Sequence, residues 1–456
     1  MTGPLTVDLA AVTDLVLRIT HGVGSRKDLP IPFGAALGGA VVALVASFVS
    51  LGALWREPRL KGSAAGRPIS SRVAALLDSR GFRWTLRGLG LLVTGYFLLG
   101  LLLGPDDALN PSAGVVYVLF WVGILVVASA LLGPVWRVLN PLRSLHLIVC
   151  RILVRDPEDA VVALPERVGQ WPAALATLSF GWLELVAPDR ATTHVLTIYL
   201  GGYALWVLVG AALFGSRWIG QADAFEAIST LYGRLSVLGR RADGVLVTRS
   251  PLNGLASLPA LPGTAAVVCV LLAITAYDGL SASPWWAGWL QSKPVSTEVM
   301  ASMSLLGVAA LVGTTYVAAT WLSGRLSGVP GLERRLPRDL AHTIVPIALG
   351  YAIAHYWSLL VIVGQQTLTA LSDPLGTGAD WLGTAGWGIS YALVGATSVA
   401  VVQVLAVVVG HVVGVVLAHD RTVALVPRSR AVRAQLPVLA LMVFFTLAGL
   451  TLLFSE

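Results

Sequence analysis

Polar and titratable side chains are rare inside the long apolar segments of this sequence, and those few are the first candidates for chemistry. Such groups are costly in hydrocarbon, so an ionisable residue there is a functional-site candidate by default. Histidine can change charge near neutral pH, and glutamine can both donate and accept a hydrogen bond. The candidates are His355, Gln366, Gln403, His411 and His419, with Asp278 and Glu184 towards the ends of two further segments.

Helical spacing would let these groups line a path across a membrane. Gln366 follows His355 by eleven residues, close to three helical turns, and therefore returns to nearly the same face. Gln403 and His411 can share one broad face of the next apolar segment. If the two segments are neighbours, Asp278 and Gln366 would lie outermost, His355 and Gln403 in the middle, then His411, with His419 at the inner edge. The pattern favours a pathway for a proton, an ion or a small solute.

The same side chains also fit two other roles. Transmembrane histidine and glutamine often make interhelical hydrogen bonds of about 0.6 kcal/mol and serve packing alone. Imidazoles from two helices can also bind haem iron or copper, and His355 with His411 is the only deep pair in the sequence. All three interpretations stay open at this point.

Motifs of enzymes and of other cofactors are absent from the sequence. There is no Cys-x-x-Cys-His, no Walker A lysine, no His-Glu-x-x-His and no Gly-x-Ser-x-Gly. A short glycine-containing stretch near the start carries His21, Arg26 and Lys27, which could bind an anion or a lipid headgroup or anchor the chain at the membrane edge. We therefore expect no catalytic residues, and haem or copper only as the alternative cofactor.

Composition identifies the class of protein. Of the 456 residues, 56% are hydrophobic and 12% charged, whereas soluble domains have about 45–50% and 25%. The mean hydropathy is +0.79. The two cysteines, Cys150 and Cys269, fall in separate segments and offer no disulfide framework. The sequence predicts an all-α membrane protein and no nucleic-acid partner.

Ten segments approach the roughly 20 apolar residues that a membrane-spanning helix requires. The fourth is the weakest, because it has only about 16 residues and contains Glu184. The segments are 31–54, 87–104, 113–133, 172–187, 194–214, 262–279, 300–321, 342–366, 391–418 and 435–453.

The distribution of positive charge supports this count. With the N-terminus outside, 26 of the 31 Lys and Arg residues fall in five cytoplasmic loops. Lys and Arg accumulate on the cytoplasmic side of membrane proteins. We therefore expect both termini outside a bacterial plasma membrane, and an Arg-rich inner face that contacts anionic lipid.

Three further segments predict amphipathic helices that lie on the membrane surface: 7–20, 141–154 and 222–239. The predicted organisation has four parts. They are an extracytoplasmic segment over 1–30 with an interfacial helix, the first five spans over 31–214, a cytoplasmic loop over 215–261 with an amphipathic helix, and the last five spans over 262–456.

Parts of the sequence resemble an uncharacterised family of polytopic actinobacterial membrane proteins. The runs Ala354 to Leu360, Ser372 to Gly376 and Gly410 to Arg421 carry the resemblance, which covers about the last quarter of the chain, and His21 to Pro30 adds to it. The resemblance implies a polytopic bacterial membrane protein and transfers no site.

The favoured function is transport of a small solute or ion, perhaps proton-coupled. The alternatives are a membrane redox, metal- or haem-binding protein that uses the intramembrane histidines, and a non-catalytic subunit of a membrane or envelope complex.

Overall fold

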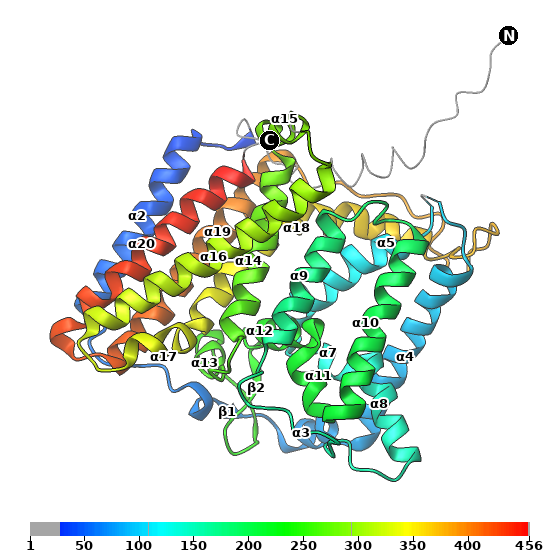
Figure 1. Ribbon diagram of the computed structural model, residues 1–456, viewed down its shortest axis with the longest axis horizontal. Coiled ribbons are helices and arrows are strands. Elements are labelled where there is room, and N and C mark those ends of the chain that lie inside the picture. Colours follow the sequence, from blue (N-terminus) through cyan, green and yellow to red (C-terminus); the bar gives the residue numbers. More distant parts are fainter. Residues whose placement is uncertain (1–27, 108, 293, 455–456) are drawn as a thin grey trace.

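The protein is described by a computed structural model that covers residues 28–107, 109–292 and 294–454. Almost all of its regular structure is helical (Figure 1). Within the described residues, nine helices are long and apolar enough to cross a membrane. The predicted all-α class is confirmed, and the helices fit an integral membrane protein.

The nine helices run back and forth through the molecule in a tilted bundle (Figure 1). The third consists of α5 (Ser112–Gly114), η3 (Val115–Ala128) and α6 (Ser129–Leu132), and the seventh of α17 (Leu332–Asp339) and α18 (Ala341–Ala370). The others are α2 (Phe33–Leu54), α4 (Arg80–Leu103), α10 (Thr193–Phe214), α14 (Thr264–Ala282), α16 (Thr297–Ser327), α19 (Ala396–Leu425) and α20 (Arg428–Leu453).

The fourth predicted span corresponds to α9 (Trp171–Leu185). Its 15 residues fall short of the roughly 20 needed to cross the hydrocarbon core, so it is not among the nine. The helix nevertheless lies against α14 along much of its length. A tenth span therefore stays a prediction.

The ninth predicted span begins too early. Residues 391–395 belong to an ordered loop, and α19 starts only at Ala396. Gln365 fixes this loop to α18, because its side chain accepts from the Ser390 backbone N–H at 2.9 Å and donates to the Ser390 carbonyl at 3.0 Å. Because the backbone N–H and carbonyl of Ser390 both bind the Gln365 side chain, the apolar stretch before Ala396 folds as a loop held against α18.

The described ends of the chain meet at one edge of the molecule. The rings of Phe33 and Phe454 have centroids 5.7 Å apart. Helix α2 packs against α19 and α20, although it is the first long helix in the chain (Figure 1). In Figure 1 a left-hand group of helices contains α2, α14, α16, α18, α19 and α20 and a right-hand group contains α4, η3, α9 and α10, and α9 packs on α14 and η3 on α18 where the groups meet.

Close packing of α18 against α19 depends on two glycines. A Cβ at Gly350 would meet the backbone of Ala406 and Gly410, and a Cβ at Gly410 would meet the backbone of Pro346 and Gly350. The small residues let the two backbones approach, as is usual between membrane helices. The contacts also fix an antiparallel register for the helix pair.

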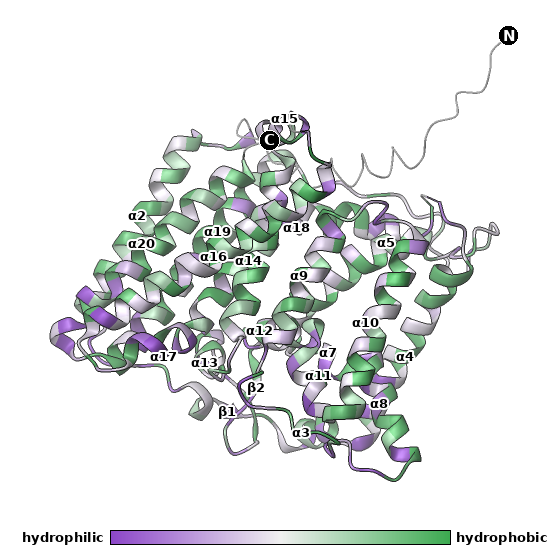
Figure 2. Cartoon of the chain, viewed as in Figure 1, coloured by the Kyte–Doolittle hydropathy of each residue, from purple (hydrophilic) through white to green (hydrophobic). Residues whose placement is uncertain are grey.

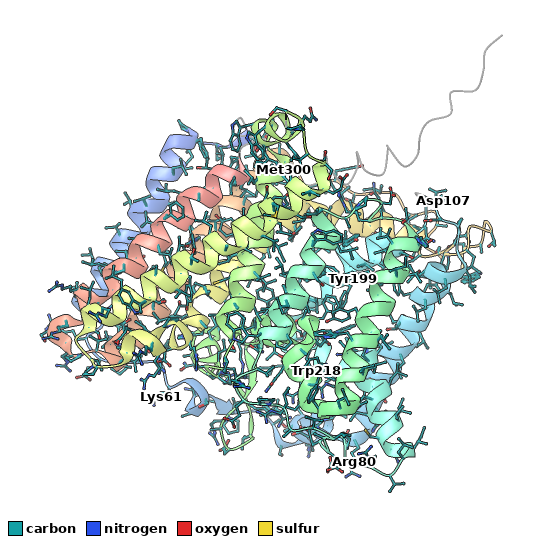
Figure 3. The ribbon with its side chains drawn as sticks, viewed as in Figure 1. Lys61, Arg80, Asp107, Tyr199, Trp218 and Met300 are labelled. Atoms are coloured by element: carbon teal, nitrogen blue, oxygen red, sulfur yellow. The ribbon has the colours of Figure 1, made fainter. Side chains whose placement is uncertain are left out.

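Short elements gather at one edge of the bundle, the lower edge in Figure 1. Figure 2 shows hydrophilic residues there, for example in α17 and at the start of α20. Figure 3 places Lys61 and Arg80 at this edge, with Asp107 and Met300 at the opposite one. The elements near this edge include η2 (Gly62–Ala64), α3 (Ser71–Asp78), α7 (Trp136–Leu139), α8 (Pro141–Ile152), α11 (Ser216–Ala222) and α13 (Pro251–Ala256).

A small antiparallel sheet lies at the same edge and joins two distant parts of the chain. Its strands are β1 (Arg67–Pro68), β2 (Leu238–Arg240) and β3 (Leu246–Thr248), in the order β1-β3-β2. At the opposite edge, α15 (Pro284–Gln291) connects α14 to α16.

The surface helix predicted over 222–239 is wrong in extent and position. The helix is α12 (Ala224–Gly233), and nine of its ten residues are buried. Its polar residues are bound inside the protein. Glu226 accepts two hydrogen bonds from Arg143 at 2.7 Å each, and Ser229 pairs with Ser129 at 2.9 Å. The amphipathic pattern of α12 therefore does not indicate a helix face exposed to solvent or lipid headgroups.

The N-cap of α12 is part of the same buried network. Asp223 accepts from the Tyr203 hydroxyl at 2.5 Å and from the Asn140 amide at 2.7 Å. Asp223 lies in the connection between α10 and α14, outside the nine candidate spans. Burial, together with the neighbouring Glu226, raises the pKa of Asp223 to about 6.

The helix predicted over 141–154 is present as α8, but its orientation differs in part. Leu145, Val149 and Ile152 are exposed, as expected for an apolar face towards lipid, and Arg151 is exposed as well. Arg143 would face water or lipid phosphate in a helix lying on the membrane surface, but it is buried against Glu226. The helix predicted over 7–20 lies outside the described residues.

Candidate functional site

An acid and an imidazole meet inside the helical bundle. His355 Nε2 lies 2.7 Å from Asp278 Oδ2, and the side chains are only 3% and 7% exposed, respectively. Asp278 lies near the end of α14 and His355 in the middle of α18, so the pair joins two of the nine helices. A lone ionised carboxylate would be costly in these surroundings, and the imidazole compensates it. The pair can therefore take up or release a proton while both partners remain hydrogen-bonded.

A tyrosine and a tryptophan extend this pair. The Tyr356 hydroxyl donates to the same Asp278 oxygen at 3.3 Å, and the Trp121 indole hydrogen-bonds Tyr356. Trp121 comes from η3, which is a π-helix of 14 residues. π-Helices are rare and often occur at functional sites. The acid thus receives hydrogen bonds from α18, and its tyrosine donor is itself held by the neighbouring helix η3.

A second carboxylate, Glu184 of α9, lies close by. Both of its side-chain oxygens are buried and make no hydrogen bond to a described residue. Its charge acts electrostatically on Asp278, Tyr117 and Tyr356. An ionised Glu184 would have no hydrogen bond from a described residue, and the charge of Arg190 would compensate it only electrostatically. We call Glu184, Asp278, His355 and Tyr356 the Asp278 cluster.

A small internal cavity adjoins the Asp278 cluster. It has room for about one water molecule. Four different elements contribute its polar lining. These residues are Trp121 of η3, Tyr232 of α12, Thr275 of α14 and Tyr356 of α18.

The Asp278 cluster and the cavity lie where the two groups of helices meet. Glu184 and Trp121 come from one group, whereas Asp278, His355 and Tyr356 come from the other. The cluster therefore joins the two groups, at the packing of α9 on α14 and of η3 on α18.

Two other predicted residues, Gln403 and His411, are fully buried but do not join the cluster. The register set by Gly350 and Gly410 brings Gln403 level with the turn of α18 that contains Ala354 and His355. Both polar atoms of the Gln403 amide, however, are without a partner among the described residues. The predicted ladder is therefore not a continuous hydrogen-bonded chain.

His411 has one bound and one unbound nitrogen. Its Nδ1 lies 2.8 Å from the Val407 carbonyl and donates to it, so Nε2 is left as an acceptor in the neutral ring. Nε2 is buried and has no partner among the described residues. The ring packs edge-to-face against Tyr351, with centroids 6.1 Å apart.

His419 makes two contacts at the lower edge. Its Nε2 lies 2.8 Å from the Trp55 carbonyl and its Nδ1 2.9 Å from the Gln435 side-chain amide. The neighbouring Asp420 accepts from the Trp55 indole at 3.0 Å and from the Arg59 backbone N–H at 2.6 Å. The two residues together hold the chain after α2 against α19.

Gln366 is not brought to the cluster. Gln366 is partly exposed towards the outer end of α18, where its neighbour Gln365 makes the contacts to the loop. His21, Arg26 and Lys27 lie outside the described residues.

The two histidines that could bind a metal ion or haem each contact a different partner. His355 Nε2 contacts Asp278, and His411 packs on Tyr351. Across the described part of the chain, no group of three or more His, Cys, Asp or Glu side chains could hold a metal ion. Cofactor binding stays a prediction that the described geometry does not favour.

Sequence reasoning identified Asp278 and His355 but missed their direct contact. It placed Asp278 at an outer mouth, whereas Asp278 is the partner of His355. The adjacency of α14 and α18 could not be read from the chain, because a long helix and two connections separate them. Tyr356 and Trp121 were missed because an aromatic residue in an apolar segment usually signals packing. The weak signal for Tyr356 was its position beside His355.

Comparison with known proteins adds no identification. No family model, no curated protein and no solved structure matches the chain. The resemblance to actinobacterial membrane proteins therefore stays a prediction, and a functional argument must start from the site itself.

Proposed function

We propose that this chain is a multi-pass membrane transporter that moves protons, alone or coupled to another small solute or ion, through the Asp278 cluster. The observation that supports the proposal is the buried Asp278–His355 pair at 2.7 Å, beside Glu184, whose carboxyl group makes no hydrogen bond to a described residue. A proton-coupled site needs groups that change charge inside the bundle, and ionisable residues at this depth commonly serve proton relays.

The proposal includes ten crossings, with α9 as the fourth. Phe33 and Phe454 lie together at one edge, and a chain that begins and ends on the same side must cross an even number of times. The described residues contain nine helices long enough to cross, so α9 would supply the tenth crossing. Because Lys and Arg accumulate on the cytoplasmic side, we propose that both ends lie outside a bacterial plasma membrane and that the edge with Lys61 and Arg80 faces the cytoplasm, against anionic lipid.

The test is proton flux in liposomes that contain the purified protein and a pH-sensitive dye. After a potential is imposed, the wild-type protein should acidify or alkalinise the lumen faster than empty liposomes do. Asp278→Asn and His355→Gln should each slow this flux about 100-fold or more, because each removes a proton-binding group and leaves a similar shape.

Asp107→Asn is the matched control, since Asp107 is exposed in an outer loop. It should leave the flux unchanged. If both Asp278→Asn and His355→Gln are folded and transport protons at the wild-type rate, the proposal is wrong.

A further inference from the structure

We infer that Arg137, Arg234 and Arg249 form a binding site for a phosphate group near the lower edge of the bundle, filled by an anionic phospholipid or by a free phosphate ion. The inference goes beyond the proposed function and does not depend on it. The sequence predicted lipid contact along the whole Arg-rich face and pointed to none of these residues individually.

Two guanidinium groups lie close together at the end of α13. Arg249 contacts this helix at Gly254, where a Cβ would lie 3.5 Å from Arg249 Nε, and its guanidinium group also lies against Gly239 of β2. Arg234 Nη1 donates to the Ser257 hydroxyl, directly after α13, at 3.0 Å. Residues three apart in a helix are neighbours on its surface, so the contacts at Gly254 and Ser257 bring the two cations together.

Both guanidinium groups lack a counter-charge. Within the described part of the chain neither forms an ion pair, whereas two neighbouring arginines, Arg240 and Arg241, each pair with an aspartate. Arg249 is only 8% exposed, and its buried Nε has no partner among the described residues. Its one hydrogen bond there is a long contact of Nη1 with the Arg240 carbonyl at 3.4 Å. A buried cation without a counter-charge is costly, so a bound anion would stabilise this arrangement.

Arg137 of α7 adds a third positive charge. Burial lowers the pKa of the Arg234 guanidinium, and the charges of Arg249 and Arg137 lower it further. One carboxylate, Glu226, is nearby, but it already accepts two hydrogen bonds from Arg143 and contacts Arg137 only at 3.9 Å. Arg137 is exposed, Arg234 partly so and Arg249 hardly at all, so an anion can reach the group from the surface.

A phosphate group suits three arginines better than a carboxylate does. Guanidinium N–H groups match the oxygens of a phosphate in pairs, and these charge-assisted hydrogen bonds are among the strongest in proteins. A carboxylate has only two oxygens, which one arginine can occupy, whereas a phosphate offers further oxygens to the others. The chemistry of the site therefore indicates phosphate.

Exposed apolar side chains beside the arginines favour a lipid as the source of the phosphate. Leu131 and Leu132 at the end of α6 and Val237 after α12 are each more than half exposed. The Leu131 carbonyl accepts a hydrogen bond from the Ser236 hydroxyl at 2.9 Å, so α6 ends beside the segment that follows Arg234. A phospholipid with its phosphate at the arginines would find an apolar surface for its acyl chains here.

Calorimetric titration of the purified full-length protein in a non-ionic detergent tests the site. The ligands are inorganic phosphate and short-chain phosphatidylglycerol, with short-chain phosphatidylcholine as the zwitterionic lipid, all at one ionic strength because salt screens exposed charges. We expect the wild type to bind at least one of the first two. Arg234→Gln and Arg249→Gln should each weaken that binding about tenfold, because each removes a charge-assisted contact.

Arg155→Gln is the matched control, since Arg155 is exposed beyond α8, and it should bind as the wild type does. Arg234 is only partly buried, so Arg234→Gln keeps the test available if Arg249→Gln does not fold.

Thermal unfolding separates a binding site from a purely structural role. Without ligand, Arg234→Gln should keep the wild-type midpoint, because it removes the repulsion from Arg249 together with the hydrogen bond to Ser257. With saturating ligand, the wild type should unfold at a higher temperature, and the variant should be stabilised much less.

The ligands distinguish the sources of the phosphate. Binding of phosphatidylglycerol alone would identify a lipid headgroup, binding of inorganic phosphate alone a free phosphate, and binding of both a site open to either. Each result supports the site when the two arginine variants weaken it. The inference is overturned if neither ligand binds, if folded variants bind as the wild type does, or if phosphatidylcholine binds equally well. Proton flux enters none of these measurements, so they leave the proposed function untouched.

Discussion

At the scale of the residue, the two carboxylates of the Asp278 cluster differ in their partners. Asp278 is tolerated because His355 and Tyr356 both contact its Oδ2. Glu184 has no donor among the described residues, and its charge acts on that of Asp278. Two neighbouring carboxyl groups in apolar surroundings resist ionising together, so a proton bound at one favours release from the other. This coupling makes Glu184 a natural exchange group for the proton on Asp278.

Substitution of Glu184 should therefore slow transport without unfolding the protein. Glu184→Gln keeps the shape and removes the proton-exchange group, so we expect proton flux in liposomes to fall about tenfold or more. Glu166→Gln is the same change at an exposed position ahead of α9 and should have no effect. Equal flux in the two variants would show that Glu184 only fills space.

At the scale of the element, the sequence predicted which segments are helical better than it predicted which helices are buried by other parts of the chain. The long helices were recognisable because length and apolar composition are local properties. Burial of α12 was not, since it depends on Arg143 and Asn140 from a segment about 80 residues earlier, which bind Glu226 and Asp223. For the same reason, His355 was recognisable as a candidate, while its pairing with Asp278 required the packing of α14 on α18.

The Arg143–Glu226 pair should be essential for the stability of α12. Arg143→Met leaves Glu226 buried, with only the exposed Arg137 at 3.9 Å, so we expect a loss of about 3–5 kcal/mol in unfolding free energy. Unfolding in detergent, followed by circular dichroism, measures this loss. The double variant Arg143→Met with Glu226→Leu should recover most of the stability, and Arg151→Met, exposed on the same helix, should cost little. A single variant as stable as the wild type would contradict this account of α12.

At the scale of the whole molecule, the Asp278 cluster lies at the junction of two groups of helices, and α9 contributes to it. Whether α9 crosses the membrane decides on which side of the membrane each later loop lies. The 15 residues of α9 are few for a membrane span, whereas the meeting of Phe33 and Phe454 at one edge favours a crossing by α9.

Cysteine labelling should place the two ends of α9 on opposite sides. In intact cells, a membrane-impermeant maleimide should label His194→Cys, after α9, and Thr377→Cys in the outer loop. Glu166→Cys, before α9, should react only after permeabilisation. The native Cys150 and Cys269 are both buried and provide a low background. Labelling of Glu166→Cys and His194→Cys from the same side would show that α9 does not cross.

The most direct test of the central claim is to observe the proton on Asp278. Infrared difference spectra of the reconstituted protein, recorded across the pH range in which proton flux changes, should contain a carboxyl C=O band that appears as the pH falls. We predict that this band is present in the wild type and in Asp107→Asn, and that it is lost together with proton flux in Asp278→Asn. A folded Asp278→Asn protein that keeps both the band and the flux would contradict the claim that this cluster carries the transported proton.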